Sequence, residues 1–415
     1  MSTRPGILFA FSFLLYSTTC LYAVSPSFVG IDFLDEGLPF ARALGVSGDG
    51  STVVGFQAWS PTGSNEFSTQ AIIWTAHEGV QLLGQLPTGE SSAAATATNQ
   101  DGSVVVGTLG NDFFFSKSSG AEAFRWTSTE GYEGLGQLSD GVNFSFATSV
   151  SDDGSVIGGY ADILRTGASE AREDGFRWTR DTGLTELSQF SPLINPRRIY
   201  GMNEDGTTLV GSFTFGSSGP VYSYILPPSG NERYLQGFTP VSEFSRATAM
   251  SDDGQVMVGF GDYTLDRRTV TGDPLAYRWT ESEGFQSLGF LEGDSASEAL
   301  DISGDGETIV GRSGLSAFIW TADSGMRALS DALIDEGIDL QGWSLQVATG
   351  VSDDGTVISG YGMNPQGQVA GWVASIPEPG QLMGMSLLAA LSLRSRSRFA
   401  YASIEVALRK NHLAD

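Results

Sequence analysis

The stretch that decides the fold reads FATSVSDDGSVIGGY over residues 146–160. It joins a segment of small residues to an apolar segment through the pair Asp153-Gly154. Six further copies of this pattern carry their turn aspartates at Asp49, Asp101, Asp205, Asp253, Asp305 and Asp354. The intervals between successive aspartates are 52, 52, 52, 48, 52 and 49 residues. A period of about 50 residues is typical of β-propeller blades and not of helical solenoids.

Each repeat is predicted to form four antiparallel strands. The Asp-Gly pair connects the innermost strand A to strand B, because this pair is a strong hairpin signal that reaches positive φ readily. A variable loop then leads to strand C, and a Gly-containing turn leads to strand D. Strand C ends in an aromatic residue in every repeat, which predicts packing between blades rather than sugar stacking: Trp74, Trp126, Trp178, Tyr224, Trp279, Trp320 and Trp372.

The phase of the repeat predicts how the ring closes. Trp372 has no strand D after it, whereas residues 28–34 precede the first strand A, where a strand D would stand. Pairing of this N-terminal strand with the last blade removes an exposed sheet edge. The predicted fold is therefore all-β, a single seven-bladed β-propeller of four-stranded antiparallel blades closed by the N-terminal strand. A short helix is predicted over Ser330–Asp339, between blades six and seven.

Composition agrees with this fold and excludes several kinds of chemistry. The 415 residues include 54 glycines, are 40% hydrophobic and carry a net charge of −26. This acidic balance argues against binding to nucleic acid or to an anionic membrane surface, since both depend on Lys and Arg. The single cysteine is Cys20 and the two histidines are His77 and His412, which excludes an internal disulfide, a cysteine-based zinc site and a multi-histidine metal site. No Gly-x-Ser-x-Gly elbow accompanies His77, which argues against a serine hydrolase.

The two ends of the chain have the pattern of export and sorting signals. Residues 1–25 combine Arg4, an apolar run and small residues, as in a secretory signal peptide. Residues 26–376 remain for the propeller. Residues 377–398 open with Pro377-Glu378-Pro379, continue through a short apolar segment and end in the cluster Arg394, Arg396 and Arg398. The apolar segment is shorter than the ~20 residues of an unaided transmembrane helix. The layout is that of a sorting signal, and an ordinary short tail anchor is the alternative interpretation. Residues 399–415 are predicted to be an unstructured tail.

These features resemble two known bacterial families. The C-terminal layout resembles the PEP-CTERM sorting signal of Gram-negative bacteria that make extracellular polysaccharide. The repeats resemble the HAF repeats of secreted bacterial proteins through Ala123-Phe124-x-Trp126 and Ala317-Phe318-x-Trp320, although the histidine is absent from every copy. The resemblance implies recognition by an exosortase, a location in the cell envelope or extracellular matrix, and membrane contact only through the C-terminal segment. It implies little about chemistry.

The blade topology predicts where ligands would bind. The tight A–B and C–D turns share one face and are predicted to be scaffold, their aspartates structural rather than calcium ligands, whereas the variable B–C and D–A loops share the other face. Predicted ligand contacts on the loop face are Trp59, Arg197, Arg198, Arg267 and Arg268. Acidic residues predicted around the channel mouth, either solvated or sharing a calcium ion, are Asp35, Glu36, Glu90, Asp140, Glu292 and Asp294. No other cofactor is predicted.

Two functional classes remain open. The favoured one is a non-enzymatic surface or matrix protein that binds polysaccharide or a surface protein through the loop face. The alternative is a carbohydrate-active enzyme, a hydrolase or lyase that uses rim carboxylates, although no pair of carboxylates stands out by its spacing. Propellers serve many unrelated functions, so the fold does not decide between these classes.

Overall fold

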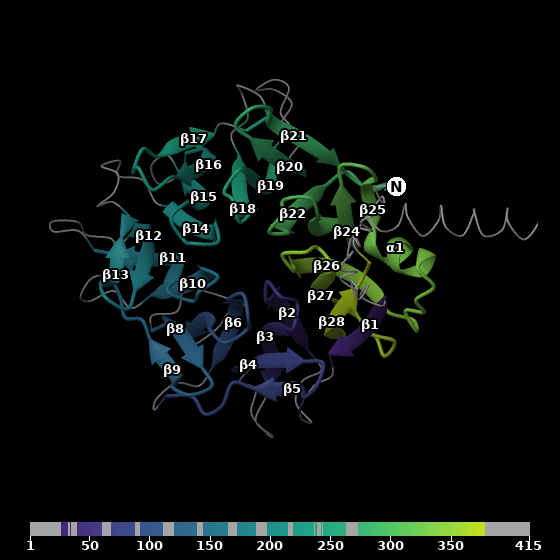
Figure 1. The fold of residues 1–415 in the computed structure, drawn as a ribbon, viewed down its shortest axis with the longest axis horizontal. Coiled ribbons are helices and arrows are strands. Elements are labelled where there is room, and N and C mark those ends of the chain that lie inside the picture. Colours follow the sequence, from purple (N-terminus) through teal and green to yellow (C-terminus); the bar gives the residue numbers. More distant parts are fainter. Residues whose placement is uncertain are drawn as a thin grey trace, which may run out of the picture.

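A computed structural model describes the propeller and not the two ends of the chain. The described residues are 26–31, 34, 40–59, 68–87, 92–110, 120–138, 144–164, 172–187, 197–214, 219–235, 237–238, 242, 244–262 and 273–377. They form seven four-stranded antiparallel sheets arranged as blades around a central axis (Figure 1). The predicted all-β, seven-bladed propeller is confirmed.

Each of the first six blades contains four consecutive strands, ordered from the axis outward. The strands of blades 1 to 3 are β2 (Ala41–Val46), β3 (Thr52–Trp59), β4 (Ser68–Thr75), β5 (Gly79–Leu82), β6 (Ala93–Thr98), β7 (Val105–Leu109), β8 (Glu122–Thr127), β9 (Gly131–Gly134), β10 (Ser145–Val150), β11 (Val156–Ile163), β12 (Arg172–Thr179) and β13 (Gly183–Glu186). Those of blades 4 to 6 are β14 (Arg197–Met202), β15 (Leu209–Thr214), β16 (Val221–Leu226), β17 (Arg233–Leu235), β18 (Ser245–Met250), β19 (Val256–Asp262), β20 (Pro274–Thr280), β21 (Gly284–Gly289), β22 (Ser297–Ile302), β23 (Ile309–Ser313), β24 (Ser316–Thr321) and β25 (Gly325–Ala328).

The seventh blade closes the ring with a strand from the other end of the chain. It comprises β26 (Ser344–Val351), β27 (Val357–Met363), β28 (Val369–Ser375) and, outermost, β1 (Ser27–Ile31). Strand β1 pairs antiparallel with β28 from Ser27↔Ser375 to Ile31↔Gly371. Trp343 packs over β1, with its ring centroid 5.6 Å from that of Phe28. The predicted closure by the N-terminal strand is confirmed.

The A–B turns form as predicted, but for a different reason. Of each Asp-Gly pair only the glycine has positive φ, as at Gly154 (69°). The Asp153 carboxylate instead accepts hydrogen bonds from Ser151 Oγ at 2.8 Å and from the Ser155 backbone N–H at 2.9 Å. These bonds hold the pKa of Asp153 below its usual value. The turn aspartate is therefore a local cap for the turn, and its structural interpretation is supported by its contacts.

A register shift recurs in strand A, and in several blades it places a threonine that hydrogen-bonds to the next blade near the axis. In blade 3 the register of β10 shifts between Ala147 and Ser149, and Thr148 stands at the shift. Its Oγ1 donates to the Ile199 carbonyl of blade 4 at 2.9 Å. Thr96, Thr248 and Thr349 make the same bond to the next blade. The shift also brings the Phe146 carbonyl so close to Gly159 that a Cβ there would collide with it. This close approach explains the glycine in strand B.

The strand C aromatics pack inside the protein, but two of the seven occupy a different position. Trp178 pairs with Ile157, and Trp74, Trp126, Trp279 and Trp320 take the same register. Tyr224 and Trp372 instead pair with the strand B glycines Gly211 and Gly360, two residues earlier in the strand. Both are fully buried. The prediction of packing is confirmed, and the assignment of one common position was wrong because spacing alone does not fix strand register.

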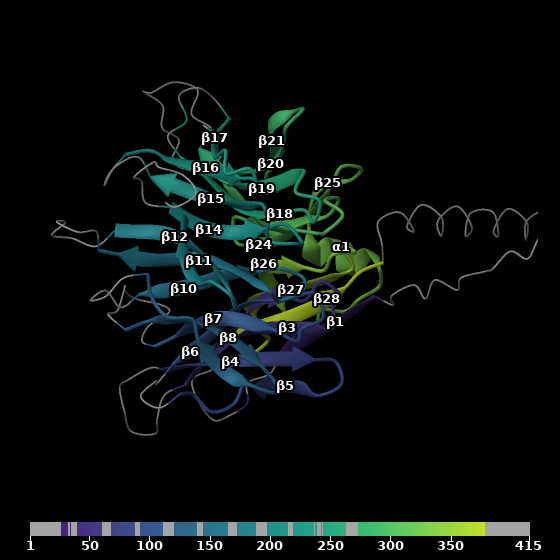
Figure 2. The same ribbon diagram turned by 60° about the vertical axis from the view of Figure 1, so that its left-hand side comes forward.

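The helix between blades six and seven is present and shorter than predicted. Helix α1 spans Leu329–Asp335 and buries Leu329 and Leu333 against β24 and β26 at the outer side of the ring (Figures 1 and 2). It ends before Gly337, whose φ is 83°. No helix among the described residues is long and apolar enough to span a bilayer.

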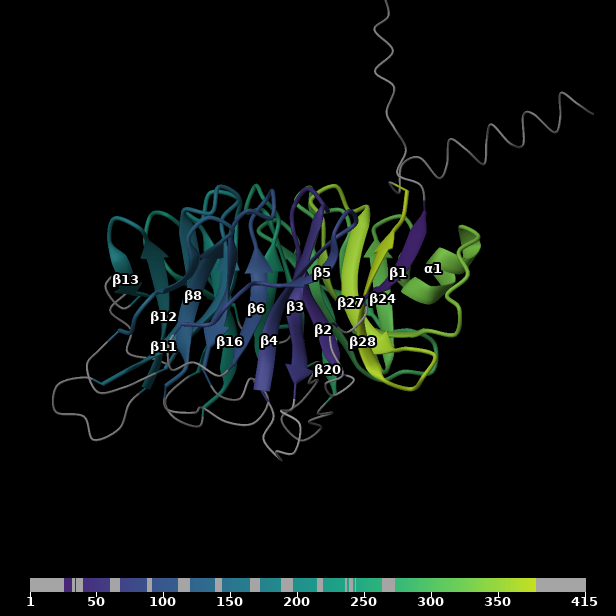
Figure 3. The same ribbon diagram turned by 90° about the horizontal axis from the view of Figure 1, so that it is seen from below.

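The two faces of the ring differ in what they carry. Figure 3 shows the A–B turns along one edge, and the described parts of the B–C and D–A connections reach the opposite edge. We call these the turn face and the loop face. Strand β1 begins and β28 ends on the turn face, where the Ile376 N–H donates to the Thr356 carbonyl at 2.8 Å, directly after the last turn. Both ends of the propeller therefore leave from the face opposite the variable loops.

Candidate functional site

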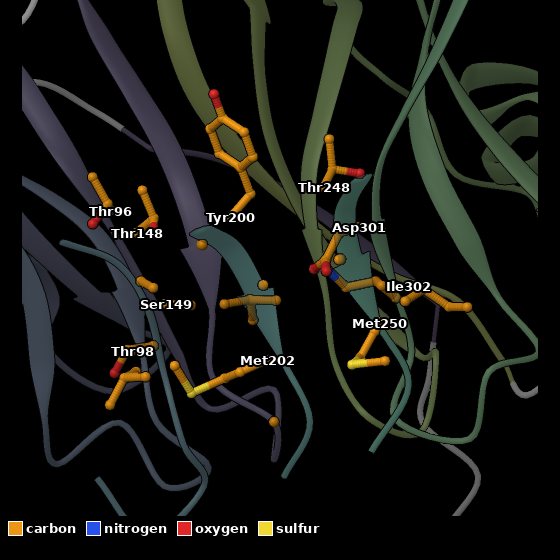
Figure 4. A pocket seen from close by; sticks show the side chains of 18 of the residues that line it. Thr96, Thr98, Thr148, Ser149, Tyr200, Met202, Thr248, Met250, Asp301 and Ile302 are labelled. Atoms are coloured by element: carbon orange, nitrogen blue, oxygen red, sulfur yellow. The ribbon is translucent and has the colours of Figure 1, made fainter. Parts of the chain in front are cut away.

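The seven A strands surround a central channel with a volume of about 420 Å³. Threonines from the strand shifts line its middle, together with Tyr200 and the methionines Met202 and Met250. In Figure 4, Tyr200 and Thr248 lie at one level, the two methionines lie at another, and Asp301 lies between these levels. The channel lining extends from Phe146 and Tyr200, near the loop face, to aspartates near the turn face. The side chains around these two ends differ in charge.

At the turn face the channel is bounded by a ring of seven backbone hydrogen bonds. The residue before each turn aspartate takes part: the N–H of Asp152 donates to the Glu204 carbonyl at 2.9 Å, and that of Asp353 to the Gly48 carbonyl at 2.9 Å. Where this residue is Gly48 or Gly304, the following aspartate supplies the donor. The ring therefore places one side-chain position from every blade at the axis. These positions hold Gly48, Gln100, Asp152, Glu204, Asp252, Gly304 and Asp353.

Three of these positions form a carboxylate cluster, defined here as Asp152, Asp252 and Asp353. One carboxylate oxygen from each lies within 4.8 Å of the other two, and all three residues are half-buried. Asp252 and Asp353 lean over the neighbouring blades, where a Cβ at Gly304 or Gly48 would collide with them. The two glycines thus leave the space in which the cluster gathers.

The electrostatics of the cluster follow from burial and like charge. Burial and the negative charge of Asp353 raise the pKa of Asp152 to about 6 and that of Asp252 to about 7. Asp301 lines the channel above the cluster and accepts a hydrogen bond from the Val351 N–H at 2.9 Å. Burial raises the pKa of Asp301 to about 7. Near neutral pH these carboxylates repel each other unless protons or cations compensate them.

The donor set of the cluster suits a hard divalent cation. Carboxylate oxygens are the ligands of Ca²⁺, at 2.3–2.6 Å, so three oxygens mutually within 4.8 Å can contact one ion. The side chain of Gln100 lies beside Asp353 and lowers its pKa by hydrogen bonding, although burial raises that pKa overall. Three carboxylates are fewer than the six to eight oxygens that Ca²⁺ takes, so water would have to complete the shell.

At the loop face the channel mouth is formed by arginines and tyrosines. Three arginines occupy the second position of their A strands, and each lies over a tyrosine of the preceding blade. The distances from guanidinium carbon to ring centroid are 4.4 Å for Arg42 and Tyr361, 4.9 Å for Arg198 and Tyr160, and 5.2 Å for Arg246 and Tyr200. Cation–π contacts of this kind hold a charged group in place without neutralising it. We call this arrangement the arginine–tyrosine mouth.

The adjacent arginines predicted to be ligand contacts have different roles. Arg197 is 1% exposed and pairs with Asp174 at 3.5 Å and Glu232 at 2.9 Å, both also buried. Its prediction as a ligand contact was wrong, because strand alternation points its side chain into the blade. Arg198 points to the mouth, where its Nε lies 2.6 Å from Glu173. The prediction gave both arginines one role because they are adjacent, but successive side chains of strand β14 point to opposite sides.

The other predicted site residues divide between described and undescribed parts of the chain. Trp59 is the last residue of β3 and pairs with Ser68, so it belongs to a strand and not to the B–C loop. Glu292 is exposed, and Asp294 accepts a hydrogen bond from Ser313 Oγ at 2.7 Å. Within the described residues, the three-carboxylate group lies at the turn face and includes neither of them. Outside the described residues lie Asp35, Glu36, Glu90, Asp140, Arg267, Arg268, Glu378, Pro379, Arg394, Arg396 and Arg398; Pro377 is the last described residue.

Two features of the channel were missed in the sequence, and each had a signal there. Three of the seven turns read Ser-Asp-Asp-Gly, at residues 151, 251 and 352. The second aspartate explains the turn, which leaves the first without a local role. The recurring arginine at the second position of strand A was the signal for the mouth. The prediction treats the turn face as scaffold and places all binding on the loops, so it uses neither signal.

Comparisons with known proteins show a shared fold. The β-propeller domain of the Trilobed protease from Pyrococcus furiosus, reported to have an open velcro topology, is 11% identical with a TM-score of 0.52, over 81% of this chain and 92% of that one. A complexed acylaminoacyl peptidase is 10% identical with a TM-score of 0.50, over 84% of this chain and 54% of that one. A structure from a study of two prolyl endopeptidases is 12% identical with a TM-score of 0.50, over 83% of this chain and 49% of that one.

The likeness is one of fold. This chain spans about half the length of the acylaminoacyl peptidase and prolyl endopeptidase chains. No family model and no curated protein sequence matches the chain. The resemblances to HAF repeats and to PEP-CTERM signals therefore remain predictions from the sequence.

Proposed function

We propose that the protein is a non-enzymatic, exported surface or matrix protein that binds polysaccharide or a surface protein through its loop face. The observation that carries this proposal is the separation of the two faces. Ser27 and Ser375 pair at the turn face, so an anchor or sorting segment after Ile376 would hold that face toward the membrane. The loop face would then point away from the cell, where a partner can reach it.

The rigid ring supports a binding role. Each blade is joined to the next by backbone bonds at the turn face, and four blades add a threonine bond in the channel. A frame of this kind holds variable loops at fixed positions. Three described rim carboxylates are engaged with neighbours, Glu173 with Arg198, Glu298 with Arg312 and Asp294 with Ser313, whereas Glu292 is exposed. This pairing favours a binding surface over the alternative of a glycan hydrolase or lyase.

The proposal is tested with purified protein and immobilised polysaccharides. Acidic and neutral polysaccharides are incubated with the protein, and retained protein and released reducing sugar are measured together. We expect retention without release. Release of sugar would replace the proposal with the enzyme alternative, and it should then disappear when a single rim carboxylate is changed. Retention of a cell-surface protein extract on the loop face, with no retention on polysaccharide, would identify a protein partner instead.

A further inference from the structure

The arginine–tyrosine mouth contains a cation, Arg246, that has no counter-charge among the described residues. The side chain of Arg246 in β18 makes no hydrogen bond and no ion pair with any residue in the described part of the chain, and its buried Nε has no acceptor there. Its neighbours are three aromatic rings: Tyr200 at 5.2 Å, Phe260 at 5.6 Å and Phe244 at 5.9 Å from its guanidinium carbon. The rings fix the position of the guanidinium but provide no acceptor for its N–H groups.

The other cations around the mouth show what Arg246 lacks. Arg198 is paired with Glu173 at 2.6 Å, and Arg312 with Glu298 at 2.6 Å. In a chain with 48 acidic and 22 basic residues, an arginine that has no carboxylate partner in the described ranges differs from its surroundings. Buried or half-buried guanidinium groups are usually paired, because desolvation of an unpaired charge is unfavourable.

Arg246 stands near the loop-face end of its A strand, because β18 begins at Ser245. It stands at the second position of its A strand, the position held in blade 3 by Phe146, which lines the channel. Arg246 is half-buried, as are the rings of Tyr200, Phe244 and Tyr361. An anion that reached Arg246 would therefore meet apolar ring surface beside the charge. Further entry into the channel would bring it toward Asp301 and the carboxylate cluster, which repel it.

We infer that the arginine–tyrosine mouth binds an acidic sugar unit, whose carboxylate pairs with Arg246 while its ring packs on the neighbouring aromatic side chains. The planar guanidinium presents two parallel donors, which match the two oxygens of a carboxylate. A sugar ring has apolar C–H faces that suit aromatic surfaces. This inference rests on the proposed function and specifies its ligand: a polysaccharide that contains uronic acid.

The experiment compares three probes with the full-length protein by calorimetry: an oligogalacturonate, the uncharged galactose oligomer of equal length, and a sulfated dextran oligomer. Arg246→Gln removes the charge but keeps hydrogen-bond donors. The matched control is Arg278→Gln in the same blade, where Arg278 in β20 pairs with Glu283 in the turn before β21. We expect R246Q to weaken oligogalacturonate binding at least tenfold and R278Q to change it less than twofold, with melting temperatures showing that both variants fold.

The outcomes separate this inference from the proposed function. Equal binding of the neutral oligomer, or unchanged oligogalacturonate binding by R246Q, would overturn the acidic-sugar assignment and leave glycan binding intact. Sulfated dextran bound as tightly as oligogalacturonate, with the same dependence on Arg246, would overturn the carboxylate specificity. If the folded wild type bound none of the three probes and no polysaccharide in the wider panel, both the inference and polysaccharide binding as the function would be overturned.

Discussion

The two ends of the central channel are built from the same repeat and have opposite chemistry. At the turn face, blades 3, 5 and 7 contribute Asp152, Asp252 and Asp353, and like charges are brought together. At the loop face, blades 1, 4 and 5 contribute arginines that lie over tyrosines. The backbone bonds between turns and the register shift in strand A recur in every blade. The difference teaches that the repeated positions keep the ring closed, while substitutions at a single axial position per blade determine what each end can bind.

The largest expected effect distinguishes Arg197, which is buried in the blade, from its neighbour Arg198 at the mouth. Replacement of Arg197 by alanine would leave the buried carboxylates of Asp174 and Glu232 without their shared cation, and should lower the free energy of unfolding by about 3–5 kcal/mol. Arg198→Ala, in the next residue, removes a partly exposed ion pair and should cost no more than about 1 kcal/mol. Chemical denaturation at pH 7 measures both. Equal losses would show that the two side chains share one role.

A second prediction concerns the repulsion at the turn face. The pKa of Asp252 in the folded protein is about 7, above the ~3.9 of an unfolded aspartate, so the folded state holds more protons between these values. Stability should therefore fall as pH rises from about 4 to 7. Asp252→Asn removes this penalty and should raise the free energy of unfolding at pH 8 by about 1–2 kcal/mol, allowing for solvent screening.

The control for this prediction is pH 4, where Asp252 is protonated in the folded state and the variant should gain little. Unfolding curves at pH 4 and pH 8 provide the measurement. A gain of the same size at both pH values would contradict the electrostatic explanation and point to a packing effect.

Two adjacent aspartates in blade 3 provide a third, smaller test. The pKa of Asp153 is lowered by hydrogen bonds from Ser155 and Ser151, so its contribution to stability is present above the unfolded pKa and is lost as pH falls through the folded pKa. Asp153→Ala should lose about 1 kcal/mol at pH 7, as for a lost turn or helix cap. Asp152→Asn should instead gain stability at pH 8, since burial and like charge raise its pKa. If both variants changed the melting temperature at pH 8 in the same direction, the two aspartates would not have the opposite effects on stability that we predict.

The smallest expected effect is that of calcium. A divalent cation at the carboxylate cluster offsets the repulsion, so 1 mM Ca²⁺ at pH 8 should raise the melting temperature by about 2 °C, which corresponds to about 1 kcal/mol for a domain of this size. The triple variant D152N/D252N/D353N should lose the response. A shift that persists in this variant would place the calcium effect elsewhere on the acidic surface.

Much of the fold was predictable because it depends on local patterns that repeat. The turn glycines, the strand alternation and the unmatched N-terminal strand together predicted the blade count and the closure through β1. The position of the strand C aromatic was not predictable. Tyr224 and Trp372 pair with strand B glycines, while Leu226 and Ala374 hold the position that Trp178 has in blade 3. A repeated aromatic does not by itself fix which residue of the neighbouring strand it faces. For the same reason the adjacent residues Arg197 and Arg198 could not be assigned to the interior and the mouth.

The candidate site was predictable only in part. The sequence pointed to the loop face and to arginines on it, and Arg198 does lie at the mouth. It did not point to Arg246, since no local pattern shows that an arginine has no carboxylate partner in the described part of the chain. It also did not bring the first aspartates of three distant turns together, because about 100 residues separate Asp152 from Asp252, and Asp252 from Asp353.

By itself the sequence determined the seven blades, the closing strand and the acidic character of the protein, because each blade's pattern is complete within about 50 residues. Only the tertiary structure decided what meets at the axis. Closing the ring brings one position from every blade into a single circle, and the backbone bonds between turns fix that circle. Proximity at the axis is a property of the closed ring, and no single repeat contains it.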